Sequence, residues 1–398
     1  MSNPKVALLS EEFPPFLFGG IGAVTWDLAC NLSKRKIHTT VFCGASNKIA
    51  IEKPNDYLEI VRLPCLDLPP RFLWFQAQNF LNILKQRRDY GIIHSVSHQM
   101  AFLSVYLKRK LKIPLITSYH GVPFYDLRAF ANSPANSWTI GDFGYSFLEF
   151  PLNDALVKVG LRNSDKIITC SKTTLNELST LYRNIDLGKS LVIPNGIDFG
   201  KIQDIKNRFK KKENVTTTSV IFAGRLYYYK GITYLLQAFE NLIPNHPNLR
   251  LNMFGAGPMK EKIQALILSR GLKDRIFLHG QVDRNQLMEE ILAADVAVFP
   301  SLREAQPVSV LEAMALEKPV VVFDFPFTRE IVKDQYSGFL ARPRDSKDLA
   351  VKIGTLLSDK RLRDRMGQNA YEYVKQHHNW EVLSNKYIDL YKSVRESR

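Results

Sequence analysis

The sequence predicts an α/β protein built from two successive doubly wound modules, each with a parallel sheet. The chain has 398 residues, which is too long for one ordinary domain. Short apolar runs alternate with longer amphipathic segments, as expected where strands alternate with helices. This alternation stops at a Lys- and Asn-rich tract, 201–214, and starts again beyond it, so we expect a domain linker there.

The first module is expected to begin with the apolar strand 5–10, a Pro- and Gly-rich turn and an amphipathic helix over 23–34. Strand-length apolar runs then recur at 39–43, 60–63, 91–95, 115–119, 166–170 and 190–193. This pattern is typical of parallel sheets that are covered by helices on both faces.

The second module repeats the pattern. We expect strands at 219–223, 249–255, 275–279, 296–300 and 320–323, and helices at 231–242, 259–270, 285–294 and 309–316. Ligands of such sheets bind outside the carboxyl ends of the strands. The turns that follow strands are therefore the places to look for functional residues.

Composition and targeting signals favour a cytoplasmic protein over a transmembrane, secreted or fibrous one. No apolar run approaches the roughly 18 residues of a membrane-spanning helix, and the N-terminus lacks the features of a signal peptide. The cysteines form no CxxC pair, which favours reduced thiols; they are Cys30, Cys43, Cys65 and Cys170. The net charge of +15 attracts polyanions in general, so nucleic acid, an anionic membrane surface and a phosphorylated small molecule are all compatible with it.

The first turn places Gly19, Gly20 and Gly22 just before a helix. Glycines there let the backbone approach a ligand, and the start of a helix favours an anion. The spacing departs from the GxGxxG fingerprint, because Thr25 stands at the third glycine position. This segment is either a phosphate loop or a tight turn.

Two further turns carry charged residues. In the segment 222–231 (FAGRLYYYKG), Arg225 and Lys230 follow a strand and precede a helix, as a diphosphate clamp would; the alternative is a solvated surface pair. In the segment 301–315 (SLREAQPVSVLEAMA), Glu304 lies in the loop and Glu312 in the following helix. One carboxylate suits the hydroxyls of a sugar and the other those of a ribose, while the helix amides near 308–310 suit phosphate. Alternatively, Glu312 is simply exposed on the helix.

Three histidines lie at or near strand ends of the first module. His120 ends the segment LITSYH, where either a structural or a catalytic role is open. His94 and His98 are four residues apart but straddle a strand end, and no third ligand is evident. We therefore predict no metal site there.

Taken together, these motifs resemble the retaining GT-B glycosyltransferases with an E-x7-E motif, of the glycosyltransferase family 4 (group 1) type. The resemblance covers nearly the whole chain. Its carriers are Gly19–Gly20, His120–Gly121, the segment 194–198 (PNGID), Gly224–Arg225–Leu226, Lys230–Gly231, the segment 255–258 (GAGP), Gly280–Gln281–Val282, and Glu304 through Glu312 with Ala313–Met314. One departure is Pro307, which lacks an N–H where many members have a Gly-Phe-Gly-type segment.

The resemblance implies two Rossmann-like domains, 1–200 and 201–379, with the C-terminal helix 380–398 returning to the first. A nucleotide-sugar donor, a UDP- or GDP-sugar, would occupy the cleft between them. The implied site residues are Arg225, Lys230 and the amides of Val308 and Ser309 at the diphosphate, Glu304 at the sugar, Glu312 at the ribose, Val282 at the base, Gly20 at the phosphates and His120 near the transferred sugar.

The implied reaction passes the sugar to an acceptor hydroxyl with retention of configuration, and the departing phosphate takes the acceptor's proton. The sequence contains no Asp-x-Asp motif that would hold a metal, so we predict neither a metal nor another cofactor. Two alternatives stay open: a nucleotide-sugar epimerase with the same fold, and a non-enzymatic protein that binds polyanions or membranes.

The acceptor is expected to be a glycan or a glycolipid, and no nucleic acid partner is expected. An aromatic-rich stretch, 124–150, follows His120. The segment 79–88, preceded by Trp74, is typical of an amphipathic helix with a basic end. Such a helix either lies on an anionic membrane, where it would reach a lipid-linked sugar, or packs within its domain.

Overall fold

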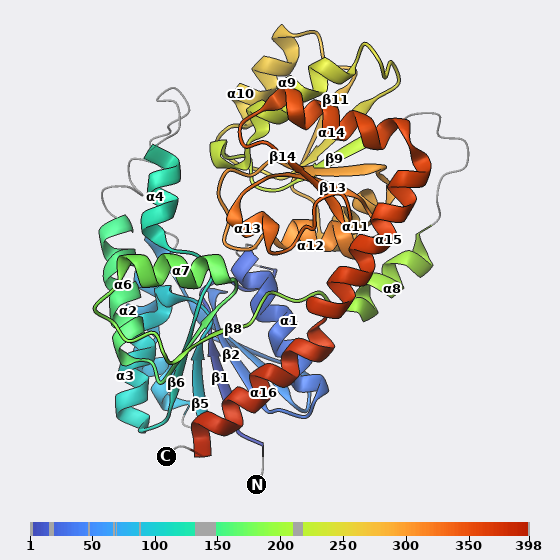
Figure 1. Ribbon diagram of the computed structural model, residues 1–398. Coiled ribbons are helices and arrows are strands. Elements are labelled where there is room, and N and C mark those ends of the chain that lie inside the picture. The colour runs from blue at the N-terminus through green and yellow to red at the C-terminus, as the bar shows by residue number, and fades with distance from the viewer. Residues whose placement is uncertain are drawn as a thin grey trace. The chain divides into compact units, whose positions relative to one another are not determined.

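The computed structural model describes residues 3–15, 20–46, 48–66, 68, 70–86, 89–131, 149–209 and 218–396. Gly19, residues 210–214 of the expected linker and residues 132–148 of the aromatic stretch lie outside these ranges. The described residues form two compact units, each with its own sheet (Figure 1). The first takes its described residues from Met1–Leu127, Phe143–Gly196 and Trp380–Arg398, and the second from Arg128–Asp142 and Ile197–Asn379.

The described part of the first unit contains an eight-stranded sheet in the order β3-β4-β2-β1-β5-β6-β7-β8. Its strands are β1 (Val6–Leu9), β2 (Thr39–Ser46), β3 (Ala50–Asn55), β4 (Leu58–Pro64), β5 (Ile92–Ser95), β6 (Leu115–Tyr119), β7 (Lys166–Thr169) and β8 (Ser190–Val192). All neighbours pair in parallel except β3, which is antiparallel to β4. The inner strands β1, β5 and β6 are buried along their whole length, with no alternation between buried and exposed residues, because helices cover both faces of the sheet.

The described helices of the first unit are α1 (Gly20–Lys34), α2 (Arg71–Lys85), α3 (Ala101–Leu111), α4 (Pro123–Ala131, which passes into the second unit at Arg128), α6 (Phe150–Asn163), α7 (Lys172–Leu181) and α16 (Trp380–Glu396), with a short 3-10 helix η1 (His98–Met100). The last of these, α16, packs against α1 and buries Tyr387 and Tyr391. At its start the Trp380 ring fills the space that a side chain at residue 196 would need, so Gly196 is required there.

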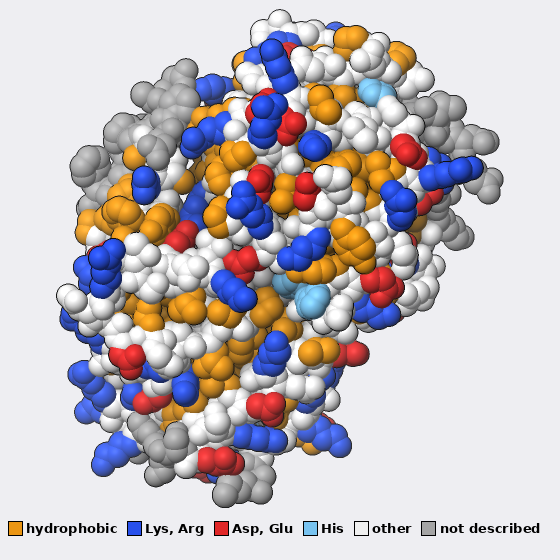
Figure 2. Space-filling model, viewed as in Figure 1, with side chains coloured by type: hydrophobic (Ala, Val, Ile, Leu, Met, Phe, Trp, Pro, Cys, Tyr) orange, Lys and Arg blue, Asp and Glu red, His pale blue; other side chains and the backbone are white. Residues whose placement is uncertain are grey.

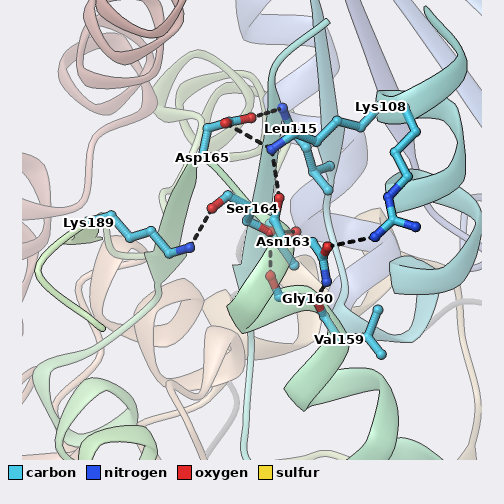
Figure 3. A network of polar contacts seen from close by, with 10 residues as sticks. Lys108, Leu115, Val159, Gly160, Asn163, Ser164, Asp165 and Lys189 are labelled. Atoms are coloured by element: carbon cyan, nitrogen blue, oxygen red, sulfur yellow. Dashed lines mark hydrogen bonds and ion pairs between the residues drawn. The ribbon is translucent and has the colours of Figure 1, made fainter. Parts of the chain in front are cut away.

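A polar network fixes the start of β6 (Figure 3). The Asp165 carboxylate accepts hydrogen bonds from the Leu115 backbone N–H and from Lys108 Nζ of α3, both at 2.8 Å. Ser164 beside it accepts from Lys189 Nζ through its carbonyl at 2.6 Å and donates its hydroxyl to the Gly160 carbonyl at 2.7 Å. The network therefore joins α3, α6 and β6, the strand whose other end carries His120.

The described part of the second unit contains a six-stranded, all-parallel sheet in the order β11-β10-β9-β12-β13-β14. Its strands are β9 (Ser219–Ala223), β10 (Arg250–Phe254), β11 (Ile276–Gly280), β12 (Val296–Phe299), β13 (Val320–Phe323) and β14 (Gly338–Ala341). Its helices are α8 (Phe199–Arg208), α9 (Ile232–Leu242), α10 (Lys260–Ser269), α11 (Arg284–Ala293), α12 (Val308–Ala315), α13 (Pro326–Arg329), α14 (Ser346–Ser358) and α15 (Lys360–His377), with a 3-10 helix η4 (Tyr228–Lys230). Apolar clusters line both faces of the sheet.

The predicted α/β fold with two doubly wound parallel sheets is confirmed. The expected linker is corrected over its first part, since residues 201–208 belong to α8. Ile202 and Ile205 are buried in a core cluster of the second unit, and the Asp198 side chain caps the helix by accepting from the Gly200 and Lys201 N–H groups. Two buried isoleucines three residues apart suffice to anchor this helix, although the segment is mostly polar.

Both sheets reverse their strand order at a central point. In the first unit the reversal lies between β1 and β5, and in the second between β9 and β12. Loops that leave the carboxyl ends of the two central strands diverge there and leave room for a ligand. The residues that follow these four strands are thus the candidates for each unit's site.

No helix within the described ranges is both long enough and apolar enough to span a bilayer. Lys and Arg side chains are scattered over the face in view, with Asp and Glu between them (Figure 2). On this face the positive charge is therefore diffuse.

Candidate functional site

The loop after β9 is held in place by glycines of the loop after β10. The Leu226 N–H donates to the Ala256 carbonyl at 2.9 Å, so the two loops lie against each other. A Cβ at residue 255 would collide with the Gly224 carbonyl, and one at residue 257 would collide with Leu226. Gly255 also has φ +133°, in a region that favours glycine. This contact explains the GAG motif and fixes the backbone on either side of Arg225.

The same loop is joined to the loop after β12. Gly231 has φ +70°, and a Cβ there would collide with the Pro300 carbonyl at the end of β12. The Leu302 N–H donates to the Tyr229 carbonyl at 2.6 Å. These contacts bring the end of the Arg225–Lys230 loop onto the loop that carries Glu304.

Lys230 and Glu304 form an ion pair between Lys230 Nζ and Glu304 Oε1. Both side chains are largely buried, at 14% and 17% exposed. The Ser301 hydroxyl donates to the same carboxylate oxygen at 3.1 Å, and Arg303 donates to the Glu304 carbonyl at 3.2 Å. The predicted diphosphate cation and the predicted sugar carboxylate therefore lie together at the strand-order reversal of the second sheet.

Arg225 lies on the exposed side of this loop, among the tyrosines that follow it. Its guanidinium donates to the Tyr229 hydroxyl at 3.0 Å and lies 5.4 Å from the centre of the Tyr227 ring. The Lys230 ammonium lies 5.5 Å from the centre of the Tyr229 ring. Tyr229 thus contacts both cations of the predicted clamp, which brings Arg225 and Lys230 to one aromatic side chain.

Glu312 lies inside α12 and is buried, so the alternative of an exposed Glu312 is wrong. Its carboxylate accepts a hydrogen bond from Arg284 Nε at 2.8 Å, with side-chain exposures of 8% for Glu312 and 18% for Arg284. Arg284 was not predicted from the sequence. An arginine at the first position of a helix is usually solvated, and its partner lies 28 residues further along the chain.

The N-terminus of α12 begins at Val308, one residue before the predicted start. Pro307 is its N-cap residue, and no side chain caps this end of the helix. The first N–H groups of a helix are left without intrahelical partners, so those of Val308 and Ser309 suit an anion. Val282 follows β11 and packs partly buried against a core cluster, one residue before Asp283 caps α11. The contacts of these residues with a nucleotide remain predictions.

In the first unit, His120 follows β6. Its Nε2 is buried and has no hydrogen-bond partner among the residues that the structure describes. Burial lowers the pKa of His120 to about 4, although a hydrogen bond with the Val96 backbone opposes this shift. The imidazole is therefore neutral near pH 7.

His98 lies parallel to the Tyr119 ring, with the ring centres 5.8 Å apart. Burial, with a smaller contribution from the neighbouring His120, lowers the pKa of His98 to about 4. His94 is a core histidine: Nδ1 is 2.7 Å from the Tyr391 hydroxyl and Nε2 is 2.8 Å from the Ser118 hydroxyl. With both ring nitrogens bonded to hydroxyl groups, His94 has no nitrogen to offer a metal.

Two further residues, Glu11 and Gly20, lie between the end of β1 and the first turn of α1. Gly20 opens this helix, and apart from its own helix and chain neighbours no atom of the described residues lies within 4 Å of the position that a Cβ would take. Glu11, which follows β1, was not predicted from the sequence. Burial raises the pKa of Glu11 to about 7, with a smaller contribution from Glu12, while Arg71 at 3.8 Å opposes the shift.

The comparisons with known proteins agree with this fold. The family "Glycosyltransferase Family 4" matches residues 18–201, and "Glycosyl transferases group 1" matches residues 203–373. An uncharacterized glycosyltransferase of Methanocaldococcus jannaschii is 27% identical over 98% of this chain and 99% of its own length.

Solved structures of low sequence identity share the fold. Sucrose-phosphate synthase from Thermosynechococcus elongatus has a TM-score of 0.82 and 21% identity, with 99% of this chain and 100% of that chain covered. Anabaena HepE in complex with UDP-glucose has a TM-score of 0.72 and 18% identity, with 98% and 100% covered. Since the two family matches together span nearly the whole sequence, the chain belongs to the GT-B glycosyltransferases of the family 4 type.

Proposed function

We propose that this chain transfers a sugar from a nucleoside-diphosphate sugar to an acceptor hydroxyl, with retention of the anomeric configuration. The observation that carries the proposal is the pairing of two carboxylates with two cations beside β9 and β12. Glu304 is paired with Lys230, and Glu312 is paired with Arg284. Anabaena HepE, which shares the fold, binds UDP-glucose, and this supports a donor of the same class.

The donor diphosphate would be held by Arg225, Lys230 and the free N–H groups at the start of α12. All of these groups favour an anion, and the loop contacts hold them in place before the ligand arrives. Glu304 would accept hydrogen bonds from the transferred sugar and Glu312 from the ribose. Val282 would contact the base through its backbone.

In the reaction, the bond between the anomeric carbon and the β-phosphate oxygen breaks, and the acceptor oxygen bonds to that carbon on the same face. The acceptor's proton passes to the departing phosphate. Negative charge grows on the β-phosphate, so fixed positive groups stabilise the transition state more than the ground state. Two cations and a helix N-terminus supply this stabilisation without a metal ion.

The histidine that the resemblance assigns to the transferred sugar suits a hydrogen-bonding role. His120 is neutral near pH 7, and its Nε2 has no partner within the described ranges. A neutral imidazole can exchange a hydrogen bond with a sugar hydroxyl without adding charge.

We propose that the acceptor is a glycan or a glycolipid. We also propose that this protein is cytoplasmic and reaches the acceptor at an anionic membrane surface. On α2, Trp74 is 40% exposed and Leu81 is 59% exposed, and Lys85 lies at the end of the helix. Exposed apolar side chains beside a cation are typical of helices that lie on membranes.

A donor screen tests the proposal. Release of nucleoside diphosphate from a panel of UDP-, GDP- and ADP-sugars is measured with and without EDTA, and NMR identifies the anomer formed. Release of one nucleoside diphosphate with a retained anomer is the expected result. Conversion of the donor to an isomeric nucleotide-sugar would indicate an epimerase. Binding without turnover of any donor would indicate a non-enzymatic protein.

A further inference from the structure

We propose that Arg284 is a positioning residue for the donor, which orients the Glu312 carboxylate toward the ribose hydroxyls and so sets the preference for ribonucleotides. This inference rests on the proposed function, because it assumes a nucleotide-sugar donor. It concerns a residue that no motif in the sequence indicated.

The placement of Arg284 is fixed by its own helix. The Asp283 carboxylate caps α11 by accepting from the Asn285 and Gln286 N–H groups, both at 3.0 Å. Arg284 is the first residue of that helix, and α11 packs against α12. Because its backbone is held by this cap, the side chain reaches Glu312 from a fixed starting point.

The pairing also fixes the Glu312 carboxylate. Only 8% of this side chain is exposed, and a buried carboxylate is costly unless it is paired and hydrogen-bonded. The bond from Arg284 Nε at 2.8 Å supplies a permanent positive charge and a directional donor. Removing the guanidinium would therefore leave the carboxylate without this directional contact.

The paired carboxylate can still bind a sugar. A carboxylate offers about four lone-pair positions, so one that is already hydrogen-bonded to an arginine can also accept from a sugar hydroxyl. A ribose presents two hydroxyls, at its 2′ and 3′ positions, whereas a 2′-deoxyribose has lost one of them. Orientation by Arg284 therefore affects the ribonucleotide more than the deoxyribonucleotide.

The test measures dissociation constants by calorimetry for UDP, GDP and ADP and for their 2′-deoxy forms. The proteins are the wild type, Arg284→Ala, Arg284→Lys and the control Arg270→Ala. Arg270 is a matched control because it also forms an ion pair with a glutamate of the second unit, at 2.9 Å. Its partner, Glu240, lies on α9 and not on α12. Thermal unfolding checks that each variant is folded, and Arg284→Gln replaces the alanine variant if that one is not.

We expect the wild type to prefer the ribonucleotide by roughly ten-fold or more, as for one hydrogen bond to a charged group. In Arg284→Ala this preference should fall to within about two-fold, because the ribonucleotide loses affinity while the 2′-deoxy form loses little. Arg284→Lys should restore part of the preference, and Arg270→Ala should keep all of it.

An unchanged preference in Arg284→Ala would overturn the inference, as would an equal loss of affinity for both forms. Each of these results would leave the proposed function standing, since the wild type would still bind a nucleotide. If the wild type bound none of the six nucleotides, the proposed donor class would fail, and the inference with it.

Discussion

The two units share a strand order around their central reversal but differ in the side chains that follow their strands. In the second unit, each important carboxylate is paired with a cation from another loop or helix, as in Lys230–Glu304 and Glu312–Arg284. In the first unit, His98 and His120 are neutral near pH 7 because burial lowers their pKa values. The difference teaches that one sheet topology can carry ion pairs in one unit and neutral rings in the other. Ion pairs can exchange partners with a phosphate, whereas neutral rings suit uncharged hydroxyl groups.

The largest expected effect is on kcat, when the cations of the second unit are removed. Arg225→Ala and Lys230→Ala should each lower kcat by about 10²–10³, because each removes a fixed positive group from the leaving phosphate. The double variant should lose less than the product of the two effects, since both cations act on the same phosphates. Initial rates of the wild type and the three variants, measured with and without EDTA, test these expectations.

The wild type should keep its rate in EDTA. Complete loss of its activity, restored by manganese, would show instead that a metal neutralises the phosphate charge.

Separating the two carboxylates sharpens the comparison within the second unit. Glu304→Gln should abolish most turnover while nucleoside-diphosphate binding survives, because the substitution leaves Lys230 without its ion-pair partner and more available to phosphate. Glu312→Ala should weaken nucleotide binding by roughly 10- to 100-fold, as expected for hydrogen bonds to a charged group. Calorimetry together with kcat distinguishes the two; equal losses of donor affinity would contradict this division of roles.

The stability of the protein at acid pH tests whether the buried histidines of the first unit stay neutral. Burial lowers the pKa of His94 to about 3, so the folded protein keeps this ring neutral while the unfolded chain protonates it near its ordinary value of 6.5. The stabilisation is present above pH 6.5 and is lost as pH falls from there toward the folded value.

In His94→Gln the free energy of unfolding should therefore fall less steeply between pH 6.5 and 4 than in the wild type, by up to a few kcal/mol. Denaturant titrations at several pH values measure it. His279→Gln, at an exposed histidine of the second unit, is the control. Parallel wild-type and His94→Gln curves would show that the buried ring does not drive the acid response.

The smallest expected effect concerns membranes. The wild type should float with anionic vesicles at low salt and less as salt rises, since charges are screened over about 10 Å at 0.1 M. Leu81→Ser should weaken flotation, while Leu268→Ser should not; both leucines are 59% exposed, the first on α2 and the second on α10 of the other unit. Absence of flotation at low salt, or equal losses in the two variants, would refute the proposed surface.

A strand could be predicted where its own residues indicate it, and not where it depends on pairing with a neighbouring strand. The strands β6, β9 and β13 were predicted to the residue because each contains adjacent apolar residues and is followed directly by a polar or turn residue: His120, Gly224 and Asp324. The strand β3 was missed because its side chains are all exposed and it contains Pro54, so nothing in its pattern indicates a strand. Its position depends on pairing with β4.

The site was predictable only where one segment carries it. The glutamates of the E-x7-E motif share a loop and a helix, and the resemblance assigned their roles. Their partners depend on the tertiary fold: Lys230 lies 74 residues before Glu304, and Arg284 comes from a neighbouring helix. The shifted pKa of Glu11 is a property of burial, which a single sequence does not display.

The ion pair between Lys230 and Glu304 makes the carboxylate a tethered competitor for the cation. An anion fixed to the same fold acts at a high effective concentration, so any anion from solution has to displace it. Inorganic phosphate offers one anionic group for this exchange. In the proposed site a diphosphate would contact Arg225 and the start of α12 as well as Lys230, and these added contacts would compensate for the displaced carboxylate. On the proposed function, the pair would thus act as a filter that keeps the site available to the donor in a solution rich in free phosphate.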